Sequence, residues 1–205
     1  MSHGHDEHRG VQPDEELTPR ARRALAMHEL LVEKGVVEDG EVEERARRVQ
    51  SRSITDGARV VARAWADPGF KSRLLADSRS AVGELGLSLT RDAELAVVEN
   101  TESVHHLVVC TLCSCYPTAL LGPPPDWYKS APYRRRAVAE PRAVMREFGL
   151  DLDEGVQVRV IDSTADLRYL VLPRRPGGTE GLSEEELAAL VTRDSMIGVS
   201  EAQSP

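Results

Sequence analysis

The sequence predicts an α+β fold with a helical N-terminal arm, and two observations support this prediction. The first part of the chain repeats apolar residues at helical spacing, whereas short runs rich in Val and Leu further along are typical of strands. The chain has 205 residues, 40% of them hydrophobic. This length suits one domain of about 150 residues with an appendage, and it is enough to bury a core.

Four helices are expected before residue 89, preceded by a tail over 1–14 that has no apolar periodicity and is predicted to be disordered. The first helix has Thr18 as N-cap and Pro19 at its first position, and it ends at Gly35. The other three are predicted at 39–49, 56–65 and 68–85. The first two helices carry only narrow apolar stripes, so they need a partner surface to bury them.

The hydrophobic period becomes strand-like after residue 88. Strands are expected at 94–99, 104–110, 156–161 and 167–172. The last two are predicted to pair with each other across a short turn. Prolines over 117–125 predict a stiff loop without regular structure, because proline fixes φ and lacks a donor.

Two shorter helices are expected in the second half of the chain. The first begins at Pro141 and is closed by Gly149. The second is predicted over 184–192, where Ser183 and Glu186 form a capping box.

The charge balance argues against two classes of partner. There are 26 Lys and Arg against 34 Asp and Glu, a formal net charge of −8. A negative surface repels phosphate backbones and anionic lipid, so neither nucleic acid nor a membrane is expected as a partner. No apolar run approaches the ~20 residues of a membrane span, and the polar start lacks the apolar core of a signal peptide. We therefore predict a cytoplasmic protein, in which Arg134, Arg135 and Arg136 face an acidic partner or solvent.

All three cysteines lie within six residues, in the C-x-x-C-x-C pattern of Cys110, Cys113 and Cys115. An odd, clustered set is a poor disulfide framework, so it indicates chemistry at one place. A zinc site is one interpretation, and it needs a fourth ligand. The nearest candidates are His105 and His106, which strand alternation sends to opposite faces.

A redox dithiol and a metal claw compete with the zinc site. A thioredoxin-like dithiol would begin a helix at the C-x-x-C, which Cys115 and the following Pro117 fit poorly. In a claw, the three sulfurs and the amide nitrogens of Ser114 and Cys115 hold one ion. An amide must lose its proton to bind, and a small trivalent ion such as Co(III) or Fe(III) stabilises that anion, whereas zinc prefers four tetrahedral ligands.

Six segments of the sequence match the pattern of a known family. They are VCTLCSCYP at 109–117, LG at 121–122, WYKS at 127–130, RY at 168–169, PGGTEG at 176–181 and RDSMIG at 193–198. Together with the arrangement of N-terminal helices, they closely resemble the α subunit of nitrile hydratase. The claw motif is highly specific for this family.

The resemblance implies a non-corrin metal in the claw. The implied ligands are the sulfurs of Cys110, Cys113 and Cys115 and the amides of Ser114 and Cys115. Cys113 is expected as sulfinic acid that tunes the charge of the ion, and Cys115 as sulfenic acid that acts as nucleophile or base. Thr111 and Tyr116 resemble the cobalt class, so Co(III) is expected rather than Fe(III).

The resemblance also assigns supporting residues. Asp162 and Arg168 match positions that support the site through contacts with the β subunit. Arg91 stands where the family commonly has a glutamine, which leaves that supporting contact in doubt. Thr118 replaces a tryptophan that lines the substrate pocket, so a bulkier nitrile is expected.

We therefore predict an extended helical arm over 15–88 and a layered α/β/β/α-type core over 89–205 that carries the claw. The predicted function is that of a cobalt nitrile hydratase α subunit, which hydrates nitriles to amides. It would act in a hetero-oligomer with a β-type chain, or with such a chain divided into two polypeptides. The alternatives are the metal-bearing γ subunit of thiocyanate hydrolase and a zinc-stabilised interaction module without catalysis.

Overall fold

The computed structural model describes residues 18–89 and 93–205. The chain divides into two compact units, with the boundary between Ala46 and Arg47, and each unit is described separately. The tail predicted over 1–14 and the proposed supporting residue Arg91 lie outside the described residues. The domain boundary predicted at 88/89 stays a prediction, and the compact units divide at a different place.

The first unit holds α1 (Pro19–Glu33) and the beginning of α2 (Glu41–Gln50). The hydroxyl of Thr18 accepts a hydrogen bond from the Ala21 N–H at 3.2 Å, and Pro19 occupies the first turn, as the sequence predicts. Gly35 ends this region with a φ of 65°. Within this unit, α1 buries no side chain.

Three helices of the second unit come before its strands: α3 (Thr55–Ala66), α4 (Pro68–Ala76) and α5 (Ser78–Glu84). The single helix predicted over 68–85 is wrong, because Asp77 interrupts it. The Asp77 side chain accepts a hydrogen bond from the Ser80 N–H at 3.0 Å and so caps a new helix. Val60 and Val61 of α3 and Leu74 of α4 are fully buried in the core.

The described residues form four strands, β1 (Glu94–Glu99), β2 (Val104–Val109), β3 (Gln157–Asp162) and β4 (Leu167–Leu172). They form two parallel pairs, β1 with β4 and β2 with β3. The predicted pairing of the last two strands is therefore wrong. The chain leaves one sheet after Asp162 and enters the other at Leu167, and each of these strands lies beside an earlier one.

The remaining helices are short. They are α6 (Thr118–Leu121), α7 (Asp126–Lys129), α8 (Ala131–Ala139), α9 (Pro141–Glu147), α10 (Glu184–Ala189) and α11 (Arg193–Ile197). The proline-dense segment therefore contains one helical turn that the sequence did not predict. The Ser183–Glu186 capping box is confirmed, but the helix it starts ends at Ala189, and Thr192 caps a separate helix.

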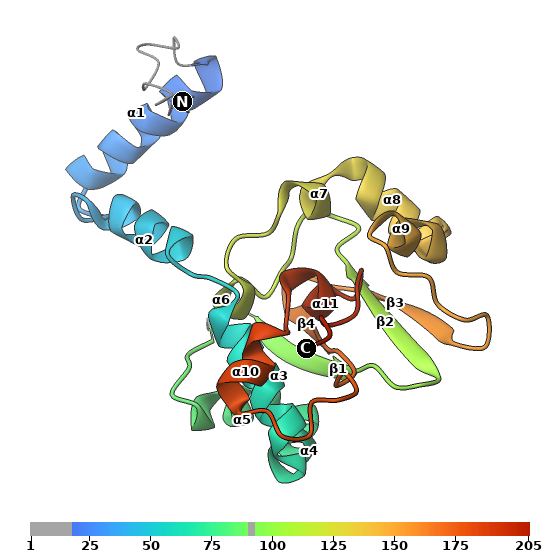
Figure 1. Cartoon of the computed structure of the whole chain (residues 1–205). Coiled ribbons are helices and arrows are strands. Elements are labelled where there is room, and N and C mark those ends of the chain that lie inside the picture. The colour runs from blue at the N-terminus through green and yellow to red at the C-terminus, as the bar shows by residue number, and fades with distance from the viewer. Residues whose placement is uncertain (1–17, 90–92) are drawn as a thin grey trace, which may run out of the picture. The chain divides into compact units, whose positions relative to one another are not determined.

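The two sheets share a core, and apart from α11, which contacts both, they are covered by different helices (Figure 1). The β1–β4 sheet contacts α4, α5 and α11, whereas the β2–β3 sheet contacts α8, α9 and α11. The mixed α+β class is confirmed. In the described part of the chain, no helix is both long and apolar enough to cross a membrane.

Gly198 lets the end of α11 lie directly against β2. Its φ is 90°, and a Cβ built on it would lie 1.9 Å from the carbonyl oxygen of His106. Only glycine allows both this left-handed conformation and this approach of two main chains. The carboxyl end of β2 leads directly into the cysteines.

Candidate metal centre

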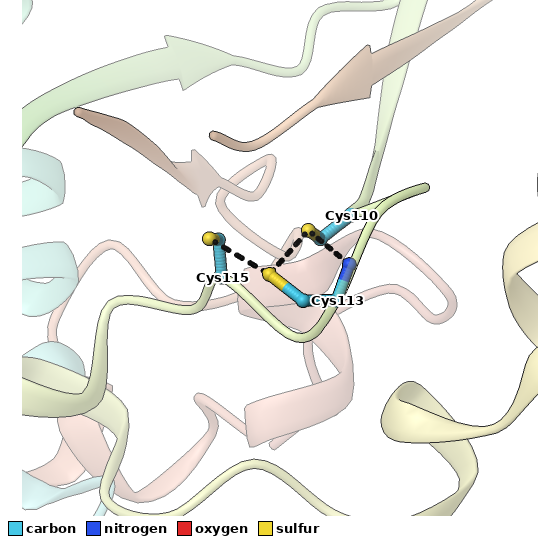
Figure 2. A group of neighbouring side chains, drawn as sticks. All are labelled: Cys110, Cys113 and Cys115. Atoms are coloured by element: carbon cyan, nitrogen blue, oxygen red, sulfur yellow. Dashed lines mark hydrogen bonds between the residues drawn. The ribbon is translucent and has the colours of Figure 1, made fainter. Parts of the chain in front are cut away.

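The three cysteines of the C-x-x-C-x-C pattern converge at the end of β2 (Figure 2). Cys110 follows the strand and is 1% exposed, Cys113 is exposed, and Cys115 is half-buried. The Sγ atom of Cys113 lies 3.5 Å from that of Cys110 and 3.3 Å from that of Cys115, and all three sulfurs lie within 4.8 Å of one another. The Cys113 N–H also donates to the Cys110 sulfur at 3.3 Å. Three sulfurs at this spacing can bind a single soft or borderline ion.

The three sulfurs alter one another's acidity. Hydrogen bonds from the thiols of Cys115 and Cys110, and from the Ser114 and Cys115 amides, lower the pKa of Cys113. Burial and the neighbouring thiols raise the pKa of Cys115 to about 12. An ion that binds all three sulfurs must displace the remaining protons.

The pairing of β2 with β3 brings Asp162 to the beginning of the cysteine loop. Val109, the last residue of β2, lies opposite Asp162. The Asp162 carboxylate accepts hydrogen bonds from the Thr111 N–H at 2.9 Å and from the Thr111 hydroxyl at 2.5 Å. The Ser163 N–H donates to the Val109 carbonyl at 2.7 Å. The strand register thus fixes the first turn of the loop.

Arg168 and Thr118 lie together at the other end of the loop. Arg168, on β4, donates from Nη1 to the carbonyl of Tyr116 at 3.3 Å. Thr118 begins α6, and the two side chains line one small hollow with Pro117 and Leu95. The structure therefore places both residues beside the cysteine loop.

Three further donors, which the sequence did not indicate as part of the site, bond the same stretch of backbone. They are the Tyr133 hydroxyl to Val108 O at 2.7 Å, Arg134 Nη1 to Leu112 O at 3.0 Å, and the Tyr128 hydroxyl to Cys115 O at 2.9 Å. The one available signal was the clustering of three of the four tyrosines shortly after the cysteines.

The expectation that the three consecutive arginines face a partner or solvent is wrong for Arg134, whereas the side chain of Arg136 is 38% exposed to solvent. Arg134 contacts the cysteine loop. Arg136 pairs with Glu140 and Glu147 of its own chain, both at 2.5 Å. Arg135 is exposed.

The two histidines considered as zinc ligands are engaged elsewhere. His105 Nε2 donates to the carbonyl of Gly198 at 2.8 Å, and its Nδ1 accepts from Asn100 Nδ2 at 3.1 Å. His106 donates from Nδ1 to the other end of the Asn100 amide at 3.2 Å. Burial lowers the pKa of both rings, which keeps them neutral. Among residues 18–89 and 93–205, the one cluster able to hold a metal consists of the three cysteines.

Comparison with known proteins identifies the family. A family model described as "Nitrile hydratase, alpha chain" matches residues 18–200. The chain belongs to this family. The resemblance seen in the sequence is thus confirmed, and with it the predicted enzyme class, nitrile hydratase.

Three relatives illustrate the range of the similarity. The low-molecular weight cobalt-containing nitrile hydratase subunit alpha of Rhodococcus rhodochrous is 50% identical over 186 residues, 90% of each chain. The thiocyanate hydrolase subunit gamma of Thiobacillus thioparus is 41% identical over 187 residues, 86% of this chain and 77% of the relative. A solved double mutant of an Fe-type nitrile hydratase from Comamonas testosteroni Ni1 superposes with a TM-score of 0.83, at 44% identity over 90% of both chains.

Proposed function

We propose that this chain is the metal-bearing α subunit of a cobalt nitrile hydratase, which adds water to an organic nitrile to give the amide. The observation that carries the proposal is the convergence of three cysteine sulfurs within 4.8 Å, in a chain of the nitrile hydratase alpha family. The cobalt-containing relative at 50% identity supports Co(III), and the Fe-type neighbour makes Fe(III) the competing ion.

Cys110, Cys113 and Cys115 would hold the ion through their sulfurs, and Ser114 and Cys115 through their amide nitrogens. The site fits such an ion, because three cysteine sulfurs, donors that suit a soft or borderline ion, lie within 4.8 Å of one another. When bound, the ion supplies Lewis acidity that polarises a cyano group or acidifies water.

The exposure of the sulfurs supports their proposed roles. Oxidation of cysteine follows thiolate character and access. Cys113 is exposed and Cys115 is half-buried, whereas Cys110 is 1% exposed. Cys113 as sulfinic acid would therefore tune the charge of the site. Cys115 as sulfenic acid would place an oxygen that attacks the nitrile carbon or takes a proton from water.

Thr118 supports a bulky substrate. It stands where the family pattern has a tryptophan, so a large wall of the substrate pocket would be absent, although the hollow that Thr118 lines with Arg168 is small in this chain by itself. The hydration rates of acrylonitrile and 3-cyanopyridine test this point in the natural protein and in Thr118→Trp. We expect the variant to lose activity mainly on the larger nitrile. A clear preference of the natural protein for acrylonitrile would contradict the proposal.

A β-type subunit, as one chain or two, is the proposed partner. Leu112 is 85% exposed and lies beside the exposed Cys113, so an apolar side chain and a reactive sulfur share one open surface. A partner that covers this surface would shield the oxidised sulfurs from further reaction. The layered α/β/β/α arrangement, supported by the helices packed on each sheet, and the cytoplasmic location remain part of the proposal.

The deciding experiment uses the chain purified with its bound partner from cells grown with cobalt. We expect one cobalt per chain, a gain of three oxygens on the 110–115 peptide under non-reducing conditions, and amide release from nitriles. Zinc with unmodified thiols would contradict the proposal. Carbonyl sulfide release from thiocyanate without amide release would favour the second candidate function, that of a thiocyanate hydrolase γ subunit, which the relative at 41% identity supports.

A further inference from the structure

One short segment supplies three donors to the backbone around the cysteines. Residues 126–134 include α7 and the beginning of α8, and we call Tyr128, Tyr133 and Arg134 of this segment the brace. The carbonyls that they bond belong to Val108, Leu112 and Cys115. One carbonyl therefore precedes the cysteine loop, one lies within it, and one belongs to its last cysteine. Both ends and the middle of the loop are thus bonded by side chains of one segment.

Tyr128 and Tyr133 of the brace belong to a packed aromatic cluster and do not lie on a free surface loop. Tyr128 is fully buried and Tyr133 is nearly so, with ring centroids 5.6 Å apart. Trp127 packs edge-on against Tyr133 at 4.9 Å and against Phe148 at 4.8 Å. The Ser130 hydroxyl caps α8 by accepting from the Tyr133 N–H at 3.2 Å. The positions of the two phenol oxygens are therefore fixed by packing.

All three side chains keep their donor protons. Burial raises the pKa of Tyr128 and Tyr133 above the usual range for a phenol. A guanidinium does not lose its proton in proteins.

The two carbonyls between the braced positions are not held by the brace. Across the described residues, no side chain donates to the carbonyl of Cys113 or of Ser114, whereas the carbonyls of Leu112 and Cys115 are held. These two peptide groups carry the amide nitrogens of Ser114 and Cys115, which both donate toward the Cys113 sulfur. The brace therefore fixes the backbone on both sides of these amides and leaves both of them able to turn toward an ion.

We propose that Tyr128, Tyr133 and Arg134 are positioning residues that hold the claw backbone in its metal-binding turn before the ion arrives. The inference rests on the proposed function, which makes the Ser114 and Cys115 amides ligands. A backbone that is already ordered loses less conformational entropy on binding, so it retains its ligand longer. Loss of one neutral hydrogen bond corresponds to about a 2- to 10-fold effect.

Two variants and one matched control test the brace. Tyr128→Phe removes one hydroxyl and keeps the ring in its cluster, and Arg134→Gln removes one guanidinium. Arg135→Gln makes the same change of charge one position along α8, at an exposed residue that has no hydrogen bond or ion pair within the described structure. Arg134→Lys restores the charge without the planar guanidinium and should recover part of the effect.

The measurements are made on the complex with its partner, before and after cobalt loading. In the metal-free complex, Tyr128→Phe and Arg134→Gln should raise the rate of amide hydrogen exchange in residues 110–117 by about 2- to 10-fold. In the loaded complex, both should lose cobalt to EDTA faster by a similar factor, and fewer of their claw peptides should carry three oxygens. The melting temperature should stay within about 4 °C of the parent.

The outcomes separate this inference from the proposed function. Exchange and cobalt loss equal to those of Arg135→Gln would overturn the role of the brace, as would an effect that merely follows a lowered melting temperature. If the parent complex carries neither cobalt nor added oxygens, the proposed function fails. The exchange rates of the metal-free chains still decide whether the brace orders the loop.

Discussion

The two ends of β2 both carry polar side chains, but they differ in what these side chains are free to do. At its beginning, His105 and His106 are buried, and Asn100 and the carbonyl of Gly198 occupy three of their four ring nitrogens. Past its end, Cys113 is exposed, and the hydrogen-bond partners of its sulfur among the described residues are other sulfurs and backbone amides.

The difference shows how to separate structural from functional polar residues. The beginning of β2, which we call the closed end, has its histidine rings hydrogen-bonded within the chain. Burial also disfavours a charge on these rings. The cysteine loop past the end of β2, which we call the open end, is different. Side chains bond its backbone carbonyls, but among the described residues the Cys113 sulfur has no hydrogen-bond partner other than sulfurs and backbone amides. The sequence offered His105 and His106 as the nearest zinc ligands but sent them to opposite faces of a strand, and their contacts at the closed end exclude them from the cysteine site.

Gly198→Ala should have the largest effect of any single change at the closed end. The added Cβ would lie 1.9 Å from the His106 carbonyl oxygen, at a φ of 90° that disfavours a side chain. We expect a loss of more than about 4 kcal/mol in the free energy of unfolding, or no folded protein. Thermal unfolding measures it, with Gly177→Ala as the control, because a Cβ there meets nothing within 4 Å. Equal melting temperatures for the two variants would show that the closed end is not rigid.

Cys113→Ser, at the open end, should affect metal binding strongly and the free energy of unfolding little. It removes one of three converging sulfurs, so we expect loss of stoichiometric cobalt and of amide formation. Because the side chain is exposed, the free energy of unfolding of the metal-free chain should change by less than about 0.5 kcal/mol. Metal analysis and urea unfolding check both points. A variant that keeps its cobalt, or one that unfolds, would remove the contrast between the two ends.

Asp162→Asn sharpens the comparison within the open end. The two hydrogen bonds from Thr111 go to different oxygens of the carboxylate, and an asparagine that keeps the bond from the Thr111 N–H turns its NH2 group, a donor, toward the Thr111 hydroxyl. Residues that orient metal ligands typically contribute 10-fold or more to metal affinity, so we expect about a 10-fold loss in cobalt affinity. Competition with a chelator measures it. Unchanged affinity would contradict this prediction and show that the other contacts of the loop are sufficient to hold it for cobalt binding.

A smaller effect is expected from pH at the closed end. Burial lowers the pKa of His105 and His106, so the unfolded chain binds protons more readily than the folded chain. Stability is therefore complete above the unfolded value of about 6.5 and falls as the pH drops below it toward the folded values. Urea unfolding at pH 7.5 and 5.5 should show this loss, and His105→Gln should reduce it. An equal pH dependence in both proteins would assign the loss to other groups.

Much of the fold follows from local sequence signals. The strand at 94–99, the proline-started helix at 141 and the capping box at Ser183 lie where the sequence predicts them, because each depends on residues close in the chain. The strand pairing was not predictable in this way. Leu167 of β4 pairs with Glu94 of β1, more than seventy positions earlier in the chain. No local pattern shows that β4 pairs with β1 and not with β3, the strand that precedes it in sequence.

The candidate site was predictable as far as its motif reaches. The spacing of Cys110, Cys113 and Cys115 indicated a shared ion, and the structure brings their sulfurs together. Tyr128 and Arg134 could not be assigned, because a side-chain donor to a distant carbonyl leaves no mark in sequence spacing. Their role emerges only when the folding of α7 and α8 onto the loop is known.

The separation in sequence between Thr111 and Asp162 has a consequence for synthesis. The two are 51 residues apart, so the three thiols leave the ribosome well before the carboxylate that anchors their turn. At about 5–20 residues per second, the interval is about 3–10 s. Throughout it the nascent polypeptide displays neighbouring, unanchored thiols. Cobalt delivery after release would meet a finished turn, whereas delivery during translation would meet a flexible chelator open to any thiophilic cation in the cell.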